Sequence, residues 1–210
     1  MKHLTVENHN YVTTVTLNRI EKRNAMSLSM WQALGDLYQE LETDNDTRVI
    51  ILTGAGGHFC AGADISEFPT VRHNAQAGER YDVIADACEI AILESSKPTI
   101  AAINGAAYGG GLEKALACDI RLCSDNAHMA LSEVKVGLCP PGGSFNLPRL
   151  IGLSNAMWLL LSGERVEAEE AYRMGIVSRV VPLDNLFETA VEMASTIASN
   201  APVAVRAPRM

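Results

Sequence analysis

The sequence has no long apolar run, no paired-cysteine motif and no excess of positive charge. No segment approaches the roughly 20 apolar residues that a membrane-spanning helix needs. The first ten residues, MKHLTVENHN, contain no apolar signal segment, so we expect a cytoplasmic protein without a membrane partner. The formal net charge of −8 disfavours nucleic acid as a partner, because nucleic acid requires a basic face.

The cysteines and histidines are scattered along the chain. The five cysteines are odd in number and none has CxxC spacing, which argues against a disulfide scaffold in a chain this long. The five histidines form no zinc-ligand pattern, and we expect no metal site. The glycine motifs of Rossmann folds and of P-loop NTPases are also absent.

Apolar residues make up 48% and charged residues 20% of the 210 residues, which allows a substantial core in one domain, or in one domain plus an extension. Strand-like and helix-like segments alternate, which indicates an α/β domain. The expected strands are a hairpin of residues 4–7 and 11–17, then 48–53, 99–103, 119–123, 129–131 and 177–181. The first expected helix is capped by Ser27 or Ser29. Further helices are expected at about 79–94, 155–161, 168–174 and 185–199, with a mobile surface loop at 69–78.

Residues 98–120, PTIAAINGAAYGGGLEKALACDI, contain the clearest strand–glycine–helix junction. Residues 99–103 are typical of a strand buried on both faces, and a helix begins within the glycines at 109–111. The start of a helix offers unpaired N–H groups and the positive end of its dipole, and glycine lets a ligand approach them closely. The junction therefore suits an anion, or an oxygen that becomes anionic. Glu113, in the same turn, could act on that ligand or could only complement the dipole.

A second junction of this kind lies at residues 58–67, HFCAGADISE, after a strand-like run. Two such junctions could aim two N–H donors at one oxygen. FCAGADI together with AAINGAAYGGGLEKALACDI resembles the enoyl-CoA hydratase/isomerase (crotonase) family. LSEVKVGLCPPGG and EKRNAMS resemble two further blocks, in the family's order and spacing. The resemblance extends from about Tyr11 to the C-terminus.

The resemblance implies a crotonase-like α/β spiral of repeated β-β-α units, right-handed, with a helical C-terminal region. Residues 1–150 would form the spiral core that carries the acyl-CoA site, and residues 151–210 a helical region shorter than usual for the family. The substrate would be an acyl-CoA thioester. No separate cofactor is expected, because coenzyme A is part of the substrate. A homotrimer or hexamer is expected from the family, although the short C-terminal region lacks helices that usually build the interface.

By position in the family motif, Glu113 and Glu133 would be the catalytic pair, and the amides of Ala63 and Gly110 would form an oxyanion hole. Taken alone, Glu133 would be interpreted as a solvated residue at a strand end, and Asp64 as an ordinary dipole partner of a helix. The residues implied for the coenzyme A site are Lys22, Arg23, Ala61, Ala63, Asp64, Ile65, Ser66 and Gly110.

Two glutamates on different elements favour hydration of 2-enoyl-CoA to 3-hydroxyacyl-CoA, in fatty acid metabolism, because water addition needs both an acid and a base. The alternatives are a Δ3-Δ2 enoyl-CoA isomerase, which needs one glutamate, and a non-catalytic acyl-CoA-binding relative. A serine peptidase using Ser144 would lack both a GxSxG motif and an evident histidine partner.

Two positions depart from the hydratase pattern. Pro141 replaces a usual glycine and has no N–H with which to hold a water or a glutamate, which favours isomerisation or another reaction of the family. Lys114 replaces an apolar or small residue, and its side chain is expected to point away from Glu113.

Overall fold

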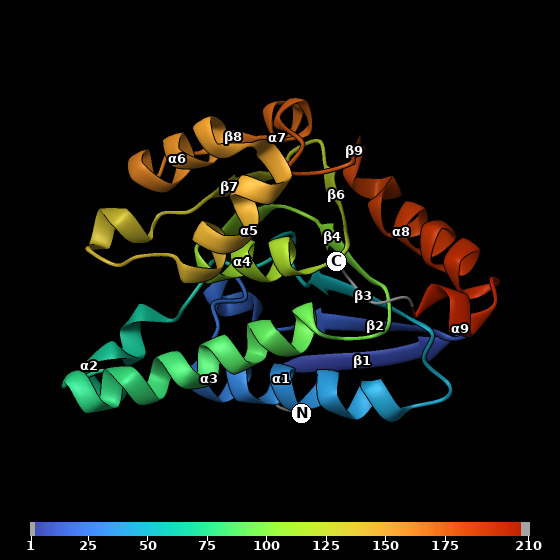
Figure 1. Ribbon diagram of the computed structural model, residues 1–210, viewed down its shortest axis with the longest axis horizontal. Coiled ribbons are helices and arrows are strands. Elements are labelled where there is room, and N and C mark those ends of the chain that lie inside the picture. The colour runs from blue at the N-terminus through green and yellow to red at the C-terminus, as the bar shows by residue number, and fades with distance from the viewer. Residues whose placement is uncertain (1–2, 207–210) are drawn as a thin grey trace.

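The computed structural model describes residues 3–206 as two β-sheets with helices packed around them (Figure 1). The strands are β1 (Leu4–His9), β2 (Val12–Leu17), β3 (Val49–Gly54), β4 (Thr99–Ile103), β5 (Ala106–Tyr108), β6 (Ile120–Ser124), β7 (His128–Ala130), β8 (Val166–Glu167) and β9 (Arg179–Val181). The α-helices are α1 (Leu28–Thr43), α2 (Phe68–Val71), α3 (Ala75–Leu93), α4 (Gly110–Ala117), α5 (Pro141–Ile151), α6 (Leu153–Ser162), α7 (Ala168–Met174), α8 (Leu183–Ala198) and α9 (Pro202–Val205). Short 3-10 helices are η1 (Ile20–Lys22), η2 (Ile65–Glu67) and η3 (Glu133–Val136).

The larger sheet has six strands in the order β1-β2-β3-β4-β6-β9, and the smaller has three in the order β5-β7-β8. β1 and β2 are antiparallel, whereas every other neighbouring pair in the larger sheet is parallel. In the smaller sheet β5 pairs with β7 in parallel, and β7 with β8 antiparallel. The parallel strands of the larger sheet are covered on both faces, as such strands require.

The chain alternates between the two sheets as it winds. β4 joins the larger sheet, β5 the smaller, and α4 follows; β6, β7 and α5 repeat this order. In the preceding repeat, which begins with β3, an isolated bridge between Cys60 and Ala107 of β5 takes the place of a strand in the smaller sheet. These stacked units confirm the α/β spiral of β-β-α repeats that the resemblance implies.

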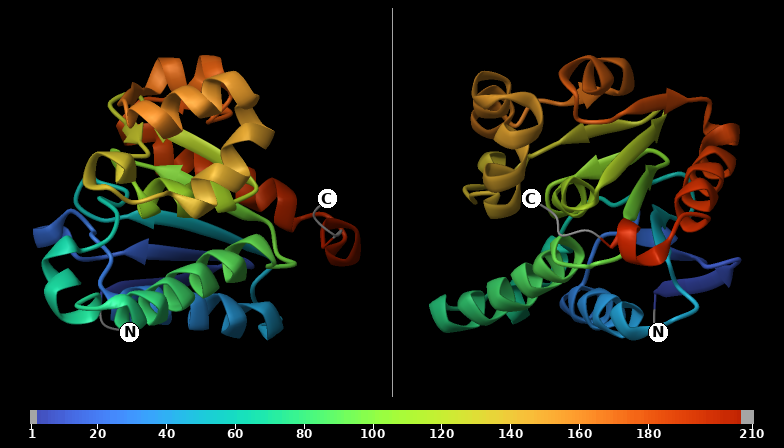
Figure 2. Two further views of the ribbon diagram at one scale, coloured as in Figure 1. Left: turned by 60° about the vertical axis from the view of Figure 1, so that its left-hand side comes forward. Right: turned by 45° about the vertical axis from the view of Figure 1, so that its right-hand side comes forward.

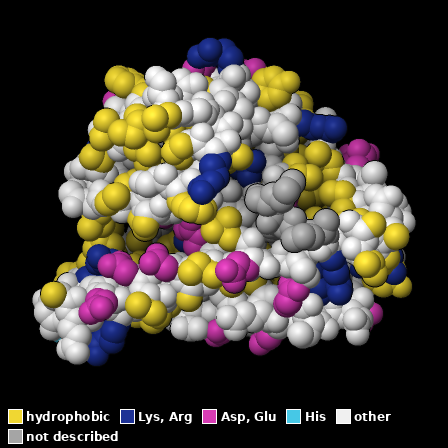
Figure 3. Space-filling view, in the orientation of Figure 1, with side chains coloured by type: hydrophobic (Ala, Val, Ile, Leu, Met, Phe, Trp, Pro, Cys, Tyr) yellow, Lys and Arg dark blue, Asp and Glu magenta, His cyan; other side chains and the backbone are white. Residues whose placement is uncertain are grey.

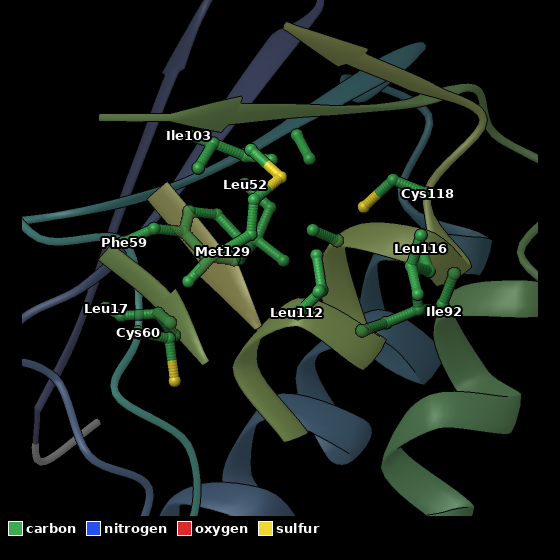
Figure 4. Packing of buried hydrophobic residues seen from close by; sticks show 14 of the residues in the cluster. Leu17, Leu52, Phe59, Cys60, Ile92, Ile103, Leu112, Leu116, Cys118 and Met129 are labelled. Atoms are coloured by element: carbon green, nitrogen blue, oxygen red, sulfur yellow. The ribbon is translucent and has the colours of Figure 1, made fainter. Parts of the chain in front are cut away.

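Two apolar layers hold the larger sheet between helices. On one side Leu52 and Ile103 face Met129 of β7 and Leu112 of α4, as Figure 4 shows. On the other side lies α8, whose buried residues recur every fourth position and pack against β2, β3, β4 and β6. Figure 2 shows α8 on the opposite side of the sheet from α1 and α3. The α8 residues of this layer are Leu186, Ala190, Ala194 and Ala198.

Local sequence signals account for several element boundaries. The Ser27 hydroxyl accepts the Met30 N–H at 3.3 Å and begins α1, as its position predicts. The hairpin turns through Asn10 and Tyr11, which both have positive φ, whereas the predicted strands left residues 8–10 for the turn. Gly175 ends α7 in the left-handed conformation.

The prediction of a mobile loop at residues 69–78 was wrong. Residues 68–71 form α2, and α3 begins at Ala75 because the Asn74 side chain accepts the Ala77 N–H at 2.8 Å. Helix α5 was also unexpected, since Pro148 and two glycines lie inside it. The fold places α5 against α4, and this packing overrides the low helix propensity of the segment.

The region expected at residues 151–210 contains α6, α7, α8 and α9, and its last four residues lie outside the described part of the chain. Its strand β9 pairs with β6 at the edge of the larger sheet, so the region contributes to that sheet as well as to the helices around it. No described helix is long and apolar enough to cross a membrane.

Candidate active site

Two pockets adjoin at the glycine turn before α4. The first has a volume of about 400 Å³ and is lined by Glu113 and Glu133; we call it the glutamate pocket. The second, of about 350 Å³, is lined by residues 61–65 and Gly109; we call it the loop pocket. The two pockets share walls, so a ligand can extend from one into the other. The residues that line both are Ala63, Phe68, Gly110, Glu133 and Leu138.

Backbone hydrogen bonds join the two glycine loops. The Tyr108 N–H donates to the Cys60 carbonyl at 2.9 Å, and the Cys60 N–H donates to the Ala106 carbonyl at 3.0 Å. The two loops are closest at Gly62, whose φ is +93°. A Cβ at Gly62 would lie 2.8 Å from the Tyr108 carbonyl oxygen and 3.7 Å from the Gly110 nitrogen. The turn before Ala63 is therefore packed against the start of α4, and only glycine fits at its closest point.

The amides of Ala63 and Gly110 are free of backbone partners. Residues on either side of Ala63 bond to Met26, which accepts the Asp64 N–H and donates to the Gly62 carbonyl. Because backbone groups alternate in direction, the Ala63 N–H points away from Met26. Gly110 begins α4, where an N–H has no acceptor within the helix. Within residues 3–206, no turn or loop hydrogen bond uses either amide as donor.

Glu113 lies in the first turn of α4 and its side chain is buried. Its Oε1 accepts the N–H of Gly143, in α5, at 2.9 Å. Burial raises the pKa of Glu113 to about 7, and the charges of Glu89 and Glu133 add to the effect, against the opposing influence of Lys114 and the Gly143 amide. Glu113 can therefore exchange a proton near neutral pH.

Glu133, the first residue of η3, is directed at the same turn. Both its carboxylate oxygens are buried, and within the described chain neither accepts a hydrogen bond from another residue. A Cβ at Gly109 would lie 3.0 Å from its Oε1. Burial raises the pKa of Glu133, while its own backbone amide and Lys114 oppose the rise. A buried carboxyl without partners is expected to meet a ligand or water.

Pro141 does not remove the amide that holds Glu113. It begins α5, where an N–H would have no acceptor within the helix, and the amide that reaches Glu113 comes from Gly143. Proline at this position thus starts the helix that supplies the donor. Ser144 lines neither pocket, and its hydroxyl donates to the Pro140 carbonyl at 2.8 Å.

The residues implied for coenzyme A divide into two groups. Ala61, Ala63, Asp64, Ile65 and Gly110 line the loop pocket. Lys22, Arg23 and Ser66 line neither pocket, although the Lys22 Nζ lies 3.4 Å from the Ser66 Oγ, and the Arg23 carbonyl accepts the Ala61 N–H at 3.1 Å.

The Asp64 carboxylate is held in place at the edge of this group. It accepts the Ser66 N–H at 3.1 Å and forms an ion pair with Arg19 at 2.8 Å. Burial alone would raise the pKa of Asp64, but these bonds to Ser66 and Arg19 outweigh it and lower the pKa. Asp64 therefore ties the loop at residues 61–66 to the preceding loop at residues 18–27.

Sequence reasoning placed the Lys114 side chain wrongly. The expectation that it points away from Glu113 was wrong, because residues 111–117 of α4 are all buried and Lys114 lines the glutamate pocket together with Glu113. Its Nζ lies 2.9 Å from Oε2 of Glu89 and 5.0 Å from the ring centroid of Trp31. A lysine directly after Glu113, in a helix whose other residues are apolar or small, was the available signal.

The outer walls are aromatic and acidic. Trp31, Phe68 and Tyr81 line the glutamate pocket together with Asp82 and Asp86 of α3. Figure 3 shows acidic side chains gathered along the face that carries α3, with a hollow between them and the helices above. Within residues 3–206, no group of three or more histidine, cysteine or acidic residues is placed to hold a metal ion.

Comparison with known proteins finds relatives over nearly the whole chain. The Enoyl-CoA hydratase/isomerase family model matches residues 7–209. A short-chain-enoyl-CoA hydratase of Clostridium acetobutylicum is 38% identical over 98% of this chain and 79% of its own length. An (E)-benzylidenesuccinyl-CoA hydratase of Thauera aromatica is 43% identical over 97% of this chain and 79% of its own. The crystal structure of an enoyl-CoA hydratase from Bacillus anthracis superposes with a TM-score of 0.94 at 38% identity, covering 98% of this chain and 80% of that one.

Proposed function

The chain belongs to the enoyl-CoA hydratase/isomerase family, and we propose that it adds water to 2-enoyl-CoA thioesters to give 3-hydroxyacyl-CoA. One observation carries the proposal: the carboxylates of Glu113 and Glu133 line one pocket together with the turns that bear the Ala63 and Gly110 amides. A single glutamate would suffice for isomerisation, whereas water addition uses an acid and a base.

We propose that the thioester carbonyl oxygen binds between the amides of Ala63 and Gly110. Negative charge grows on this oxygen as water attacks the conjugated double bond. Two preset N–H donors stabilise that charge more in the transition state than in the ground state. The free orientation of both amides supports this assignment.

The two glutamates would handle the protons. One carboxylate takes a proton from water as the water oxygen bonds to C3, and the other carboxyl delivers a proton to C2 as the electrons of the double bond form the new C–H bond. A pKa of about 7 lets Glu113 serve in either role near neutral pH. The unpartnered oxygens of Glu133 leave it able to contact the attacking water.

The coenzyme A part of the bound substrate would extend out of the site through the loop pocket, along residues 61–66. Ala61, Asp64 and Ile65 line this pocket, and Lys22 lies beside Ser66 at its edge. The charge of Lys22 and that of the exposed Arg23 suit phosphate groups. The acyl group would enter the glutamate pocket, whose wall includes Trp31 and Tyr81.

We also propose a cytoplasmic homotrimer or hexamer that acts in fatty acid metabolism. Support for the assembly comes from large apolar side chains exposed on α5 and α6, visible in the upper part of Figure 3. Light scattering of the purified chain would give the oligomeric state. The exposed residues concerned are Phe145, Leu150, Leu153, Met157, Trp158 and Leu161.

The decisive experiment is an activity screen of the purified chain with a panel of 2-enoyl- and 3-enoyl-CoA thioesters in isotopically labelled water. Hydration predicts loss of the enoyl absorbance and one labelled oxygen in the product. Conversion of a 3-enoyl to a 2-enoyl thioester without incorporation of labelled oxygen would show that the chain is an isomerase and not a hydratase. Thioester binding without any product would make the chain a non-catalytic relative.

A further inference from the structure

A buried ion pair joins Lys114, which lines the glutamate pocket, to Glu89 of α3. Lys114 of α4 is 4% exposed and Glu89 of α3 is 6% exposed. The Lys114 Nζ donates to Oε2 of Glu89 at 2.9 Å, and the Asn146 amide donates to Oε1 of Glu89 at 3.2 Å. Both oxygens of Glu89 therefore have partners, and the pair connects α3, α4 and α5.

Lys114 also reaches the walls of the site. Its ammonium group lies 5.0 Å from the Trp31 ring centroid, a distance at which the ring face attracts a cation. The Trp31 ring in turn stands over the glycine turn, since a Cβ at Gly110 would lie 3.2 Å from it. The Trp31 indole N–H donates to the Tyr81 hydroxyl at 2.8 Å, which fixes the ring. The charge of Lys114 is thus held between Glu89 and Trp31, beside the two carboxylates.

Stability alone does not account for this pair. Taking two charges out of water is unfavourable, and apolar residues of similar volume are often at least as stabilising in a core. The pair also lies in a buried region, where water screens charges poorly, so its electrostatic effect on nearby carboxyls is strong. A buried charge next to two titratable carboxyls acts on their protonation whatever else it does.

We propose that Lys114 and Glu89 are positioning residues that set the charge state of Glu113 during turnover, with Lys114 favouring the ionised carboxylate and Glu89 moderating that effect. The proposal rests on the hydratase mechanism above, in which Glu113 exchanges a proton with water or substrate. Neither residue of the pair is required to touch the substrate.

The groups that face Glu113 act with opposite signs. Burial raises its pKa most, Lys114 lowers it, Glu89 raises it, the Gly143 amide lowers it and Glu133 raises it. Removing Lys114 should therefore make Glu113 harder to ionise, and removing the charge of Glu89 should make it easier. A role in packing alone predicts no such opposition.

The first test is the pH dependence of kcat/KM for crotonyl-CoA hydration. Lys114→Met should move the limb that Glu113 controls up by about one pH unit; this is the acid limb if Glu113 is the base and the alkaline limb if it is the acid. Glu89→Gln should move the same limb down, and the double variant should return it close to wild type. Arg173→Met and Glu170→Gln are matched controls, because they break an exposed ion pair on α7 with the same changes of net charge. Neither control should move the limb.

The second test needs no turnover. A carbon NMR titration of protein with labelled glutamate carboxyls, assigned by Glu113→Gln, would follow Glu113 directly in each variant. Opposite shifts in Lys114→Met and Glu89→Gln support the proposal; unchanged titration, or shifts of one sign, overturn it. If Lys114→Met does not fold, the isosteric Glu89→Gln alone decides: a lowered pKa of Glu113 supports the proposal, and an unchanged or raised pKa overturns it. Failure of the wild-type chain to hydrate any thioester would instead refute the proposed function, which this titration does not test.

Discussion

The Gly143 amide donates a hydrogen bond to Glu113 Oε1 at 2.9 Å and so joins the first turn of α5 to the first turn of α4. One oxygen of Glu113 is thereby fixed, and the carboxyl cannot rotate freely in the pocket. Glu133 has no such bond to another described residue. The two glutamates therefore differ in hydrogen bonding and in the groups that shift their pKa values, as expected for a pair in which one is the acid and the other the base.

Replacing Glu133 by glutamine should lower kcat for hydration at least about a hundredfold, the low end for loss of a general acid–base group. The amide has nearly the same shape but cannot exchange a proton. Steady-state assays with crotonyl-CoA would measure the effect. The control is Glu164→Gln, which removes an exposed carboxylate that lines neither pocket. A loss of tenfold or less in Glu133→Gln would remove this residue from the mechanism.

The raised pKa of Glu113 has a consequence for stability. A carboxyl whose pKa is 4.5 when unfolded and about 7 when folded stabilises the fold below pH 4.5, and this contribution disappears as the pH rises to about 7. The free energy of unfolding of the wild-type chain should therefore fall relative to that of Glu113→Gln across this range, by up to about 3 kcal/mol.

Urea unfolding of both proteins at several pH values would measure the difference. Glu133 is present in both proteins, so its own raised pKa adds a contribution of the same sign to both curves and largely cancels in their difference. A difference that stays constant with pH would show that the pKa of Glu113 is the same in the folded and unfolded states.

Gly62→Ala should impair catalysis through the position of the Ala63 amide. A Cβ at Gly62 would lie 2.8 Å from the Tyr108 carbonyl oxygen, so the two glycine loops must move apart. Loss of one oxyanion donor typically costs about 2.7–4 kcal/mol, and a comparable decrease in kcat/KM is expected.

Gly57→Ala is the matched control for this substitution. Its φ of +76° is strained for alanine in the same way, yet no atom lies within 4 Å of its added Cβ. It should lose roughly 1 kcal/mol of stability with little change in kcat/KM. Equal kinetic losses in both variants would assign the effect to backbone strain rather than to the separation of the loops.

Pro141→Gly should leave hydration nearly unchanged. The amide that holds Glu113 belongs to Gly143, and Pro141 occupies the first position of α5, where an added N–H has no helical acceptor. We expect a change in kcat of less than about threefold and a loss of about 0.4–1 kcal/mol in stability from the greater freedom of the unfolded chain. Assays and thermal unfolding would measure both. A gain of tenfold or more in kcat would mean that the missing amide at residue 141 limits water addition.

Local sequence determined the type and position of several strands, turns and helix starts. The apolar run of β4, the glycines before α4 and the cap at Ser27 act within a few residues of themselves, through periodicity, permitted φ values and side-chain bonds to nearby amides. Because such signals depend only on neighbouring residues, they can be recognised without knowledge of the fold. The four motif blocks then implied the spiral and the candidate pair Glu113 and Glu133, because they carry family information that no single block contains.

Only the tertiary structure decided how these parts meet. The bond from Gly143 to Glu113 and the pairing of Ala63 with Met26 join segments distant in sequence, and no local pattern encodes them. β5 lies between Gly105 and Gly109, inside the segment that the sequence predicts as a glycine-rich junction, so no strand was predicted there. Helix α5 forms against its own composition because packing on α4 outweighs propensity. Lys114 was placed wrongly for the same reason: which way a side chain on a fully buried helix points depends on the partner that the fold supplies, and here that partner is Glu89, on another helix.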